Sequence, residues 1–196
     1  MKQWVVVVGG TNMDIVARTP RAGCDRHLHR NLAPAQVAKV QAAAARAGVP
    51  VAFEPVSVAK AARLADLARG LFLLTPNTDE LAALTGRPKA QWRASVTDLH
   101  GRGNEHLWVR TGADGSWMCS RGKDPVHLPA VPATVVDVTG AGDAMLAGWI
   151  AAWLRGADPV TAAGEGHRAA AATVESPHTV RPDLAAVLTV PEHEEP

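Results

Sequence analysis

Residues 135–145 of the chain read Val135-Val136-Asp137-Val138-Thr139-Gly140-Ala141-Gly142-Asp143-Ala144-Met145. A short β-branched run meets two glycines and an aspartate and then enters a long apolar segment, which predicts a strand end, a tight turn and a helix start. Glycine lets the backbone turn sharply and approach a ligand closely, and the first amides of a helix have no partner within that helix. The turn is therefore a candidate anion site.

Asp143 falls in the first turn of the predicted helix, beside the amides of Gly140, Ala141 and Gly142. A carboxylate next to a phosphate-binding turn suggests phosphoryl transfer, with the carboxylate as the base. The alternative interpretation is a helix with an acidic first turn after a glycine-containing loop, which many folds contain.

The complete segment Asp137-Val138-Thr139-Gly140-Ala141-Gly142-Asp143 resembles the C-terminal signature of the PfkB (ribokinase-like) family of carbohydrate and nucleoside kinases. The resemblance implies that Asp143 is the catalytic base and that the amides of Gly140, Ala141 and Gly142 form the anion hole for the transferred phosphoryl group. Val138 is a departure, because the family often has Ser or Thr there. It leaves the named groups intact.

Composition favours a small-molecule partner. The chain has 196 residues, 47% of them hydrophobic, and 20 Lys and Arg against 19 Asp and Glu give a formal net charge of +1. These totals predict a single domain over residues 1–190 with a polar tail at 191–196, and they indicate neither a nucleic-acid polymer nor a membrane as partner. The chain has only two cysteines, and it shows neither a signal-peptide core nor an apolar run long enough to span a membrane. We therefore expect a cytoplasmic protein.

The N-terminal segment predicts a ligand-binding edge. Residues 4–8 form a β-branched run closed by Gly9-Gly10, typical of a strand buried on both faces in a parallel sheet. Polar residues 11–14 would then lie at the carboxyl edge of the sheet, where α/β proteins usually bind ligands. This segment also resembles the first strand and loop of the PfkB family, which implies that Asn12 and Asp14 bind substrate hydroxyls. Turn hydrogen bonds made by the same side chains are the alternative.

Strand and helix patterns alternate from residue 34 to residue 174. Helices are predicted at 34–47, 58–68, 78–86, 89–99, 144–154 and 159–174, and strands at 49–53, 71–74, 106–110, 116–120, 126–128 and 134–136. The alternation predicts an α/β fold with a mostly parallel sheet covered by helices. The family resemblance implies a ribokinase-like three-layer αβα sandwich, here truncated and without the β lid.

The segment Asn77-Thr78-Asp79-Glu80 is a capped helix start by its chemistry. It also fits the Asn-x-x-Glu motif of the PfkB family, whose asparagine and glutamate help to organise the magnesium and phosphate environment. The resemblance thus implies that Asn77 binds nucleotide and that Glu80 serves Mg²⁺ through water, which suits an ion that keeps much of its hydration shell.

Two further nucleotide contacts are implied by the resemblance. A Thr/Gly turn commonly lies against the ATP phosphates and ribose in the family, and Thr111 and Gly112 match it. A plain hairpin is the alternative interpretation of that turn. His167 falls near the position where relatives contact adenine, but a core or surface histidine would look identical there.

Residues 54–61 and 173–176 most resemble the corresponding segments of pseudouridine kinases. The implied reaction transfers the γ-phosphoryl group of ATP to a primary hydroxyl, giving pseudouridine 5′-phosphate when pseudouridine is the acceptor. Another ribokinase-like sugar kinase is an alternative within the same family.

Residues 17–31 read as a loop. Their Arg/His-rich part, residues 18–30, stands where the family has its β lid, its Gly-rich N-terminal signature and several βα units. This arrangement resembles an internal deletion. Loss of the lid would weaken water exclusion and would expose a sheet edge that favours a homodimer. A catalytically impaired kinase remnant that at most binds nucleotide is therefore the second hypothesis.

Overall fold

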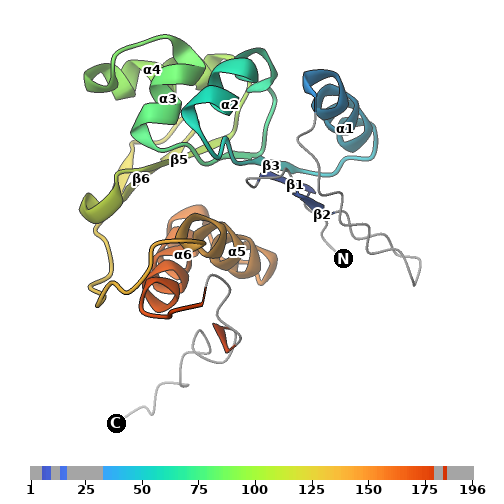
Figure 1. Cartoon of the computed structure of the whole chain (residues 1–196). Helices are drawn as coiled ribbons and strands as arrows, with labels where there is room; N and C mark the ends of the chain where they lie inside the picture. The colour runs from blue at the N-terminus through green and yellow to red at the C-terminus, as the bar shows by residue number, and fades with distance from the viewer. Residues whose placement is uncertain (1–5, 10–13, 17–32, 179–182, 185–196) are drawn as a thin grey trace, which may run out of the picture. The chain divides into compact units, whose positions relative to one another are not determined.

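The computed structural model of the chain describes residues 6–9, 14–16, 33–178 and 183–184 (Figure 1). The chain divides into two compact units, the first formed by residues 1–112 and 116–127 and the second by residues 113–115 and 128–196. Each unit is described by itself below. None of the helices in the described ranges is long and apolar enough to cross a membrane.

The first unit is organised by a seven-stranded sheet with the order β2-β1-β3-β4-β5-β6-β7. Neighbours among β1, β3, β4 and β5 pair in parallel, whereas β2 is antiparallel to β1 and β6 is antiparallel to β5. The predicted mostly parallel sheet is thus confirmed. The strands are β1 (Val6–Gly9), β2 (Asp14–Val16), β3 (Val51–Phe53), β4 (Leu73–Leu74), β5 (His106–Arg110), β6 (Ser116–Ser120) and β7 (Val126–Leu128).

Four helices of the first unit cover one face of this sheet (Figure 1). Their apolar side chains form a single buried cluster with strand residues, in which Leu81 and Leu99 pack with Phe53, Leu74 and Leu107. Burial of such side chains is the main stabilising contribution to the unit. The helices are α1 (Pro34–Arg46), α2 (Val58–Arg63), α3 (Thr78–Thr85) and α4 (Trp92–Gly101), with 3-10 turns η1 (Ala65–Leu67), η2 (Lys89–Gln91) and η3 (Gly112–Asp114).

The second unit contains α5 (Ala141–Leu154) and α6 (Pro159–Val174), which lie side by side. Asp158 caps α6, because its carboxylate accepts hydrogen bonds from the backbone N of Val160 at 2.9 Å and of Thr161 at 3.2 Å. The two helices approach closely at Gly148, where an added Cβ would lie 2.9 Å from the Cβ of Ala169. Small residues are therefore required at this crossing.

Two sequence predictions are corrected by the described residues. The predicted strand at 134–136 is wrong, since this segment belongs to no strand and Val135 and Val136 are 62% and 60% exposed. The backbone N of Val136 donates instead to the carbonyl of Val174, at the end of α6. The helix predicted at 58–68 is shorter, because α2 ends at Arg63 and the chain continues as the 3-10 turn η1. The predicted loop at 17–31 lies outside the described residues.

Candidate functional site

The turn at residues 137–143 leads into α5 as the sequence predicts. Gly140 precedes the helix with φ of 82°, a left-handed conformation that glycine adopts without a steric penalty. The backbone N of Ala141 donates to the carbonyl of Val138 at 3.2 Å, so this amide of the predicted anion hole is engaged within the turn. The amides that follow, on Gly142 and Asp143, belong to the first turn of α5, whose amides point toward the helix N-terminus. They are the groups through which α5 can hold an anion.

Asp137 organises the same turn. Its Oδ1 accepts hydrogen bonds from the backbone N of Thr139 at 2.9 Å and from the Thr139 hydroxyl at 2.8 Å. These two bonds lower the pKa of the Asp137 carboxyl below its ordinary value, and the bond from the backbone N has the larger effect. The sequence analysis missed this role, although an Asp followed two residues later by Thr is a recognisable turn signal.

Asp143, the predicted base, lies exposed in the first turn of α5. The positive end of the helix dipole favours its ionised carboxylate, the form that can accept a proton. The backbone therefore presents Asp143 beside the amides of its own helix start, as the sequence predicts, while its catalytic role stays a prediction.

In the first unit, the Asn-x-x-Glu motif forms a capping box at the start of α3. Asn77 Oδ1 accepts from the backbone N of Glu80 at 2.9 Å, and Glu80 Oε2 accepts from the backbone N of Asn77 at 2.9 Å. Glu80 is only 2% exposed. A buried carboxylate needs charged or hydrogen-bonding partners, so the environment of Glu80 is more than a helix cap.

The further partner of Glu80 is Arg110, the last residue of β5. Arg110 Nη1 lies 2.6 Å from Oε1 of Glu54, which follows β3, and Nη2 lies 3.5 Å from Oε2 of Glu80. Three elements thus bring one guanidinium and two carboxylates together at the carboxyl edge of the parallel strands, where ligands of α/β proteins usually bind. Sequence analysis missed both Glu54 and Arg110 as site residues, although each follows a predicted strand or ends one.

Polar side chains of this edge retain hydrogen-bonding capacity. Thr75, which is 1% exposed, and Thr111 have buried hydroxyl oxygens with no hydrogen-bond partner among the described residues. Thr111 directly follows Arg110, and Gly112 comes next with φ of 66°. The predicted nucleotide contacts Asn77, Thr111 and Gly112 and the predicted metal-associated Glu80 therefore share the first unit.

The donor set of this edge suits Mg²⁺ bound largely through water. No group of three or more His, Cys, Asp or Glu side chains that could hold a metal ion occurs within the described ranges. The side chains of Glu54, Glu80 and Arg110 carry a formal net negative charge and present oxygen atoms. Such a set fits an ion that keeps several waters and shares substrate phosphates, and it does not fit a fully protein-bound cation.

The remaining predicted residues are placed as follows. His167 on α6 is 6% exposed, and its Nδ1 donates to the carbonyl of Pro129 at 3.0 Å, as the core-histidine alternative expects. Asp14 begins β2, where its backbone pairs with Gly9 at the carboxyl end of β1. Asn12 lies outside the described residues.

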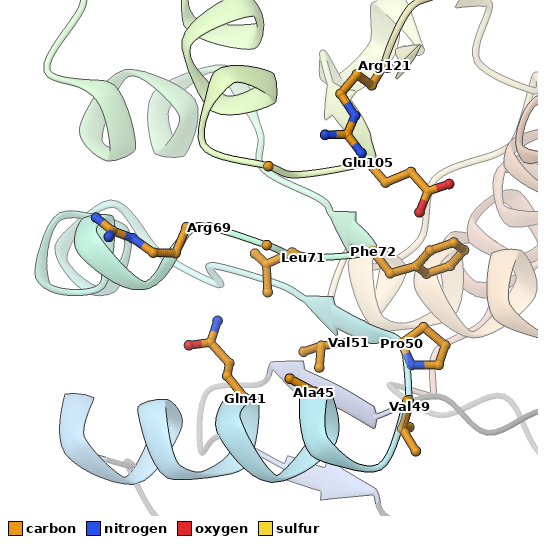
Figure 2. A pocket seen from close by; sticks show the side chains of 13 residues that line it. Gln41, Ala45, Val49, Pro50, Val51, Arg69, Leu71, Phe72, Glu105 and Arg121 are labelled. Carbon is orange, nitrogen blue, oxygen red and sulfur yellow. The ribbon is translucent and has the colours of Figure 1, made fainter.

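A separate cavity of about 310 Å³ lies at the opposite, amino end of the parallel strands (Figure 2). Val51 at the start of β3, Leu71 and Phe72 before β4, and Glu105 before β5 contribute to its walls. Of the predicted site residues that the structure describes, none lines it.

Comparisons with known proteins identify relatives that are kinases. The 1-phosphofructokinase of Haloferax volcanii is 36% identical over 135 residues, which cover 67% of this chain and 44% of the relative. The pseudouridine kinase of Arabidopsis thaliana is 27% identical over 203 residues, with 72% of this chain and 54% of the relative covered. The chain spans about half the length of the curated relatives that it matches.

The fold agrees with these relatives. The structure of Arabidopsis thaliana ribokinase complexed with ribose and ATP superposes with a TM-score of 0.68 at 27% identity, covering 81% of this chain and 53% of that chain. The model of the pfkB family carbohydrate kinases matches residues 21–185, a range that covers most of the chain and includes the segments 77–80 and 137–143 described above. On this evidence the chain belongs to the pfkB family of carbohydrate kinases.

Proposed function

We propose that this chain is an ATP-dependent phosphotransferase that phosphorylates a primary hydroxyl of a sugar or nucleoside. The observation that carries the proposal is the turn at 137–143, where Gly140 allows a tight entry into α5 and Asp143 stands in the first helical turn. Family membership supports the same reaction. Both units belong to one kinase domain over residues 1–190 in this proposal.

The chemistry assigned to the second unit is proton acceptance and charge stabilisation. The acceptor hydroxyl oxygen forms a bond to the γ-phosphorus of ATP as the bond from that phosphorus to the β–γ bridging oxygen breaks, and ADP leaves. Asp143 accepts the hydroxyl proton, and the backbone amides of Gly140 and Gly142 stabilise negative charge on the transferring group. The amide of Ala141 can join them only by giving up its hydrogen bond to the carbonyl of Val138. Positioning and electrostatics account for most catalysis of phosphoryl transfer.

The first unit is assigned to the nucleotide. Asn77, Thr111 and Gly112 contact ATP, and Glu80 holds Mg²⁺ through water. When bound, Mg²⁺ would neutralise phosphate charge. The acceptor is assigned to Asn12 and to Asp14, and the backbone of Asp14 pairs with Gly9 at the carboxyl end of β1. Burial and the bond to Pro129 do not support an adenine contact for His167.

Pseudouridine is the acceptor proposed first, because residues 54–61 and 173–176 resemble pseudouridine kinases and one matched relative is a pseudouridine kinase. A second matched relative is a 1-phosphofructokinase, so another sugar acceptor is the alternative. The Arg/His-rich segment 18–30, which stands where the family has its lid and Gly-rich signature, favours a different alternative, an impaired remnant that at most binds nucleotide.

A coupled ADP-release assay tests the proposal. Purified protein is incubated with Mg²⁺ and ATP and with pseudouridine, uridine, adenosine, ribose or fructose. We expect acceptor-dependent ADP release that falls by about 10²-fold or more in Asp143→Asn, since the amide cannot act as the base. Binding of ATP should be retained in this variant.

The outcomes separate the hypotheses. Transfer retained in Asp143→Asn would remove Asp143 as the base. A folded protein that binds ATP but releases no ADP with any acceptor would support the impaired remnant. A folded protein that binds no nucleotide would contradict the proposed kinase activity and would leave a remnant that has also lost nucleotide binding.

A further inference from the structure

The side chain of Arg110 is largely buried and contacts two carboxylates, unlike that of a typical surface arginine. Its side chain is 14% exposed, and its guanidinium contacts Glu54 at 2.6 Å and Glu80 at 3.5 Å. Its backbone N donates to the carbonyl of Pro76 at 2.9 Å. The backbones of Arg110 and Asn77 also form an isolated parallel β-bridge just before α3. Both the backbone and the side chain of Arg110 therefore contact the segment that carries the Asn-x-x-Glu motif.

The contacts of Glu80 converge on one carboxylate oxygen. Oε2 accepts from the backbone N of Asn77 at 2.9 Å and also faces the guanidinium of Arg110. Two contacts on one oxygen restrict rotation of the carboxylate, and hence the direction of Oε1, more than the capping bond alone does. Without Arg110, the capping bond would still hold Oε2, but the carboxyl group could rotate about it.

Glu54 anchors the guanidinium on the other side. Glu54 is 7% exposed and pairs with Arg110 through the short contact between its Oε1 and Nη1. A planar guanidinium can meet two carboxylates at once with separate N–H groups, whereas an ammonium is a single point charge. The geometry therefore depends on arginine and not on positive charge alone.

We propose that Arg110, held by Glu54, is a positioning residue that orients the Glu80 carboxylate and the Asn77 cap for the Mg²⁺ and phosphates of bound ATP. This inference rests on the proposed function. It assigns to Arg110 a role through Glu80, with no contact between Arg110 and the reacting atoms. Residues that support metal-associated groups in this way typically change metal affinity by about 10- to 100-fold when replaced.

The test measures binding of a non-hydrolysable ATP analogue by calorimetry over a range of Mg²⁺ concentrations, without any acceptor, together with the thermal midpoint Tm. In Arg110→Met we expect the analogue to bind about 10- to 100-fold more weakly at limiting Mg²⁺. We also expect Tm to fall, because the buried ion pair between Arg110 and Glu54 is broken. Arg110→Lys should bind the analogue with intermediate affinity, since the positive charge is kept but the planar guanidinium that can meet two carboxylates is lost.

A double variant separates positioning from stability. Arg110→Met with Glu54→Gln removes both charges of the buried pair, so Tm should recover toward the wild-type value while the Mg²⁺-dependent binding stays weak. Glu54→Gln alone should weaken binding less than Arg110→Met. Arg102→Met is a matched control, because Arg102, just after α4, pairs with Asp98 of α4 at 2.6 Å. This variant should lower Tm without changing the affinity for the analogue.

Three results would overturn the inference alone: wild-type affinity in Arg110→Met, wild-type affinity in the double variant, or a loss in Glu54→Gln as large as in Arg110→Met. The last two would assign Arg110 a purely structural role or transfer the positioning role to Glu54. Failure of the wild-type protein to bind the analogue would overturn the proposed function as well. The two failures are therefore distinguishable.

Discussion

At the scale of single residues, Cys119 shows how burial controls reactivity. It lies on β6 with 1% exposure, and burial raises the pKa of its thiol to about 12, although the positive charge of Arg93 acts in the opposite direction. The thiolate is the reactive form of cysteine. A pKa this high leaves about a thousandfold less thiolate at pH 8 than an exposed cysteine would have.

We therefore predict that Cys119 resists thiol reagents in the native protein and reacts once the protein unfolds. The measurement is the rate of labelling by a disulfide reagent at pH 8 with and without guanidinium chloride, in a Cys24→Ser variant so that only Cys119 reports. Fast labelling without denaturant would show that the β6 region opens readily.

At the scale of secondary-structure elements, the crossing of α5 and α6 depends on one glycine. An added Cβ at Gly148 would lie 2.9 Å from the Cβ of Ala169 and 3.0 Å from both the Glu165 carbonyl oxygen and the Gly166 Cα. Real Cβ atoms are not accommodated at such distances without movement of backbone. Overpacking of this kind typically costs about 1–3 kcal/mol.

We predict that Gly148→Ala lowers the free energy of unfolding by about 1–3 kcal/mol. Gly164→Ala is the matched control, because an added Cβ at Gly164, inside α6, meets no heavy atom within 4 Å. It should stabilise the protein by about 0.5–1 kcal/mol, since alanine is the better helix former. Urea denaturation of both variants measures the difference, and equal effects would contradict the close crossing.

Local side-chain caps explain why the starts of α2, α3 and α6 could be predicted from the sequence. Asn77 caps α3, Ser57 accepts from Lys60 N at the start of α2, and Asp158 caps α6. Each cap depends on residues two or three positions further along the chain, so the signal is contained in the local sequence. The strand at 134–136 was predicted from β-branched residues alone. It was wrong because strand formation also needs a neighbouring strand with free backbone groups.

At the scale of the whole molecule, the nearly balanced charge governs self-association. The formal net charge is +1 at pH 7 and the isoelectric point calculated from the sequence is about 7.9. Electrostatic self-repulsion is weakest where the net charge is zero. We predict that light scattering at constant ionic strength is greatest near pH 7.9 and decreases toward about pH 6 and about pH 9.5. Scattering independent of pH would indicate association through apolar surface.

Apart from the strand predicted at 134–136, the sequence by itself determined the order of helices and strands from residue 34 onward, the mostly parallel α/β class and the two family motifs. These features depend on local propensity, capping and hydrophobic pattern, which act over a few residues. Only the tertiary structure brought Glu54 within 2.6 Å of Arg110, 56 positions away. Parallel pairing of β3, β4 and β5 aligns their carboxyl ends at one edge, and that pairing between distant segments decides which charged side chains meet.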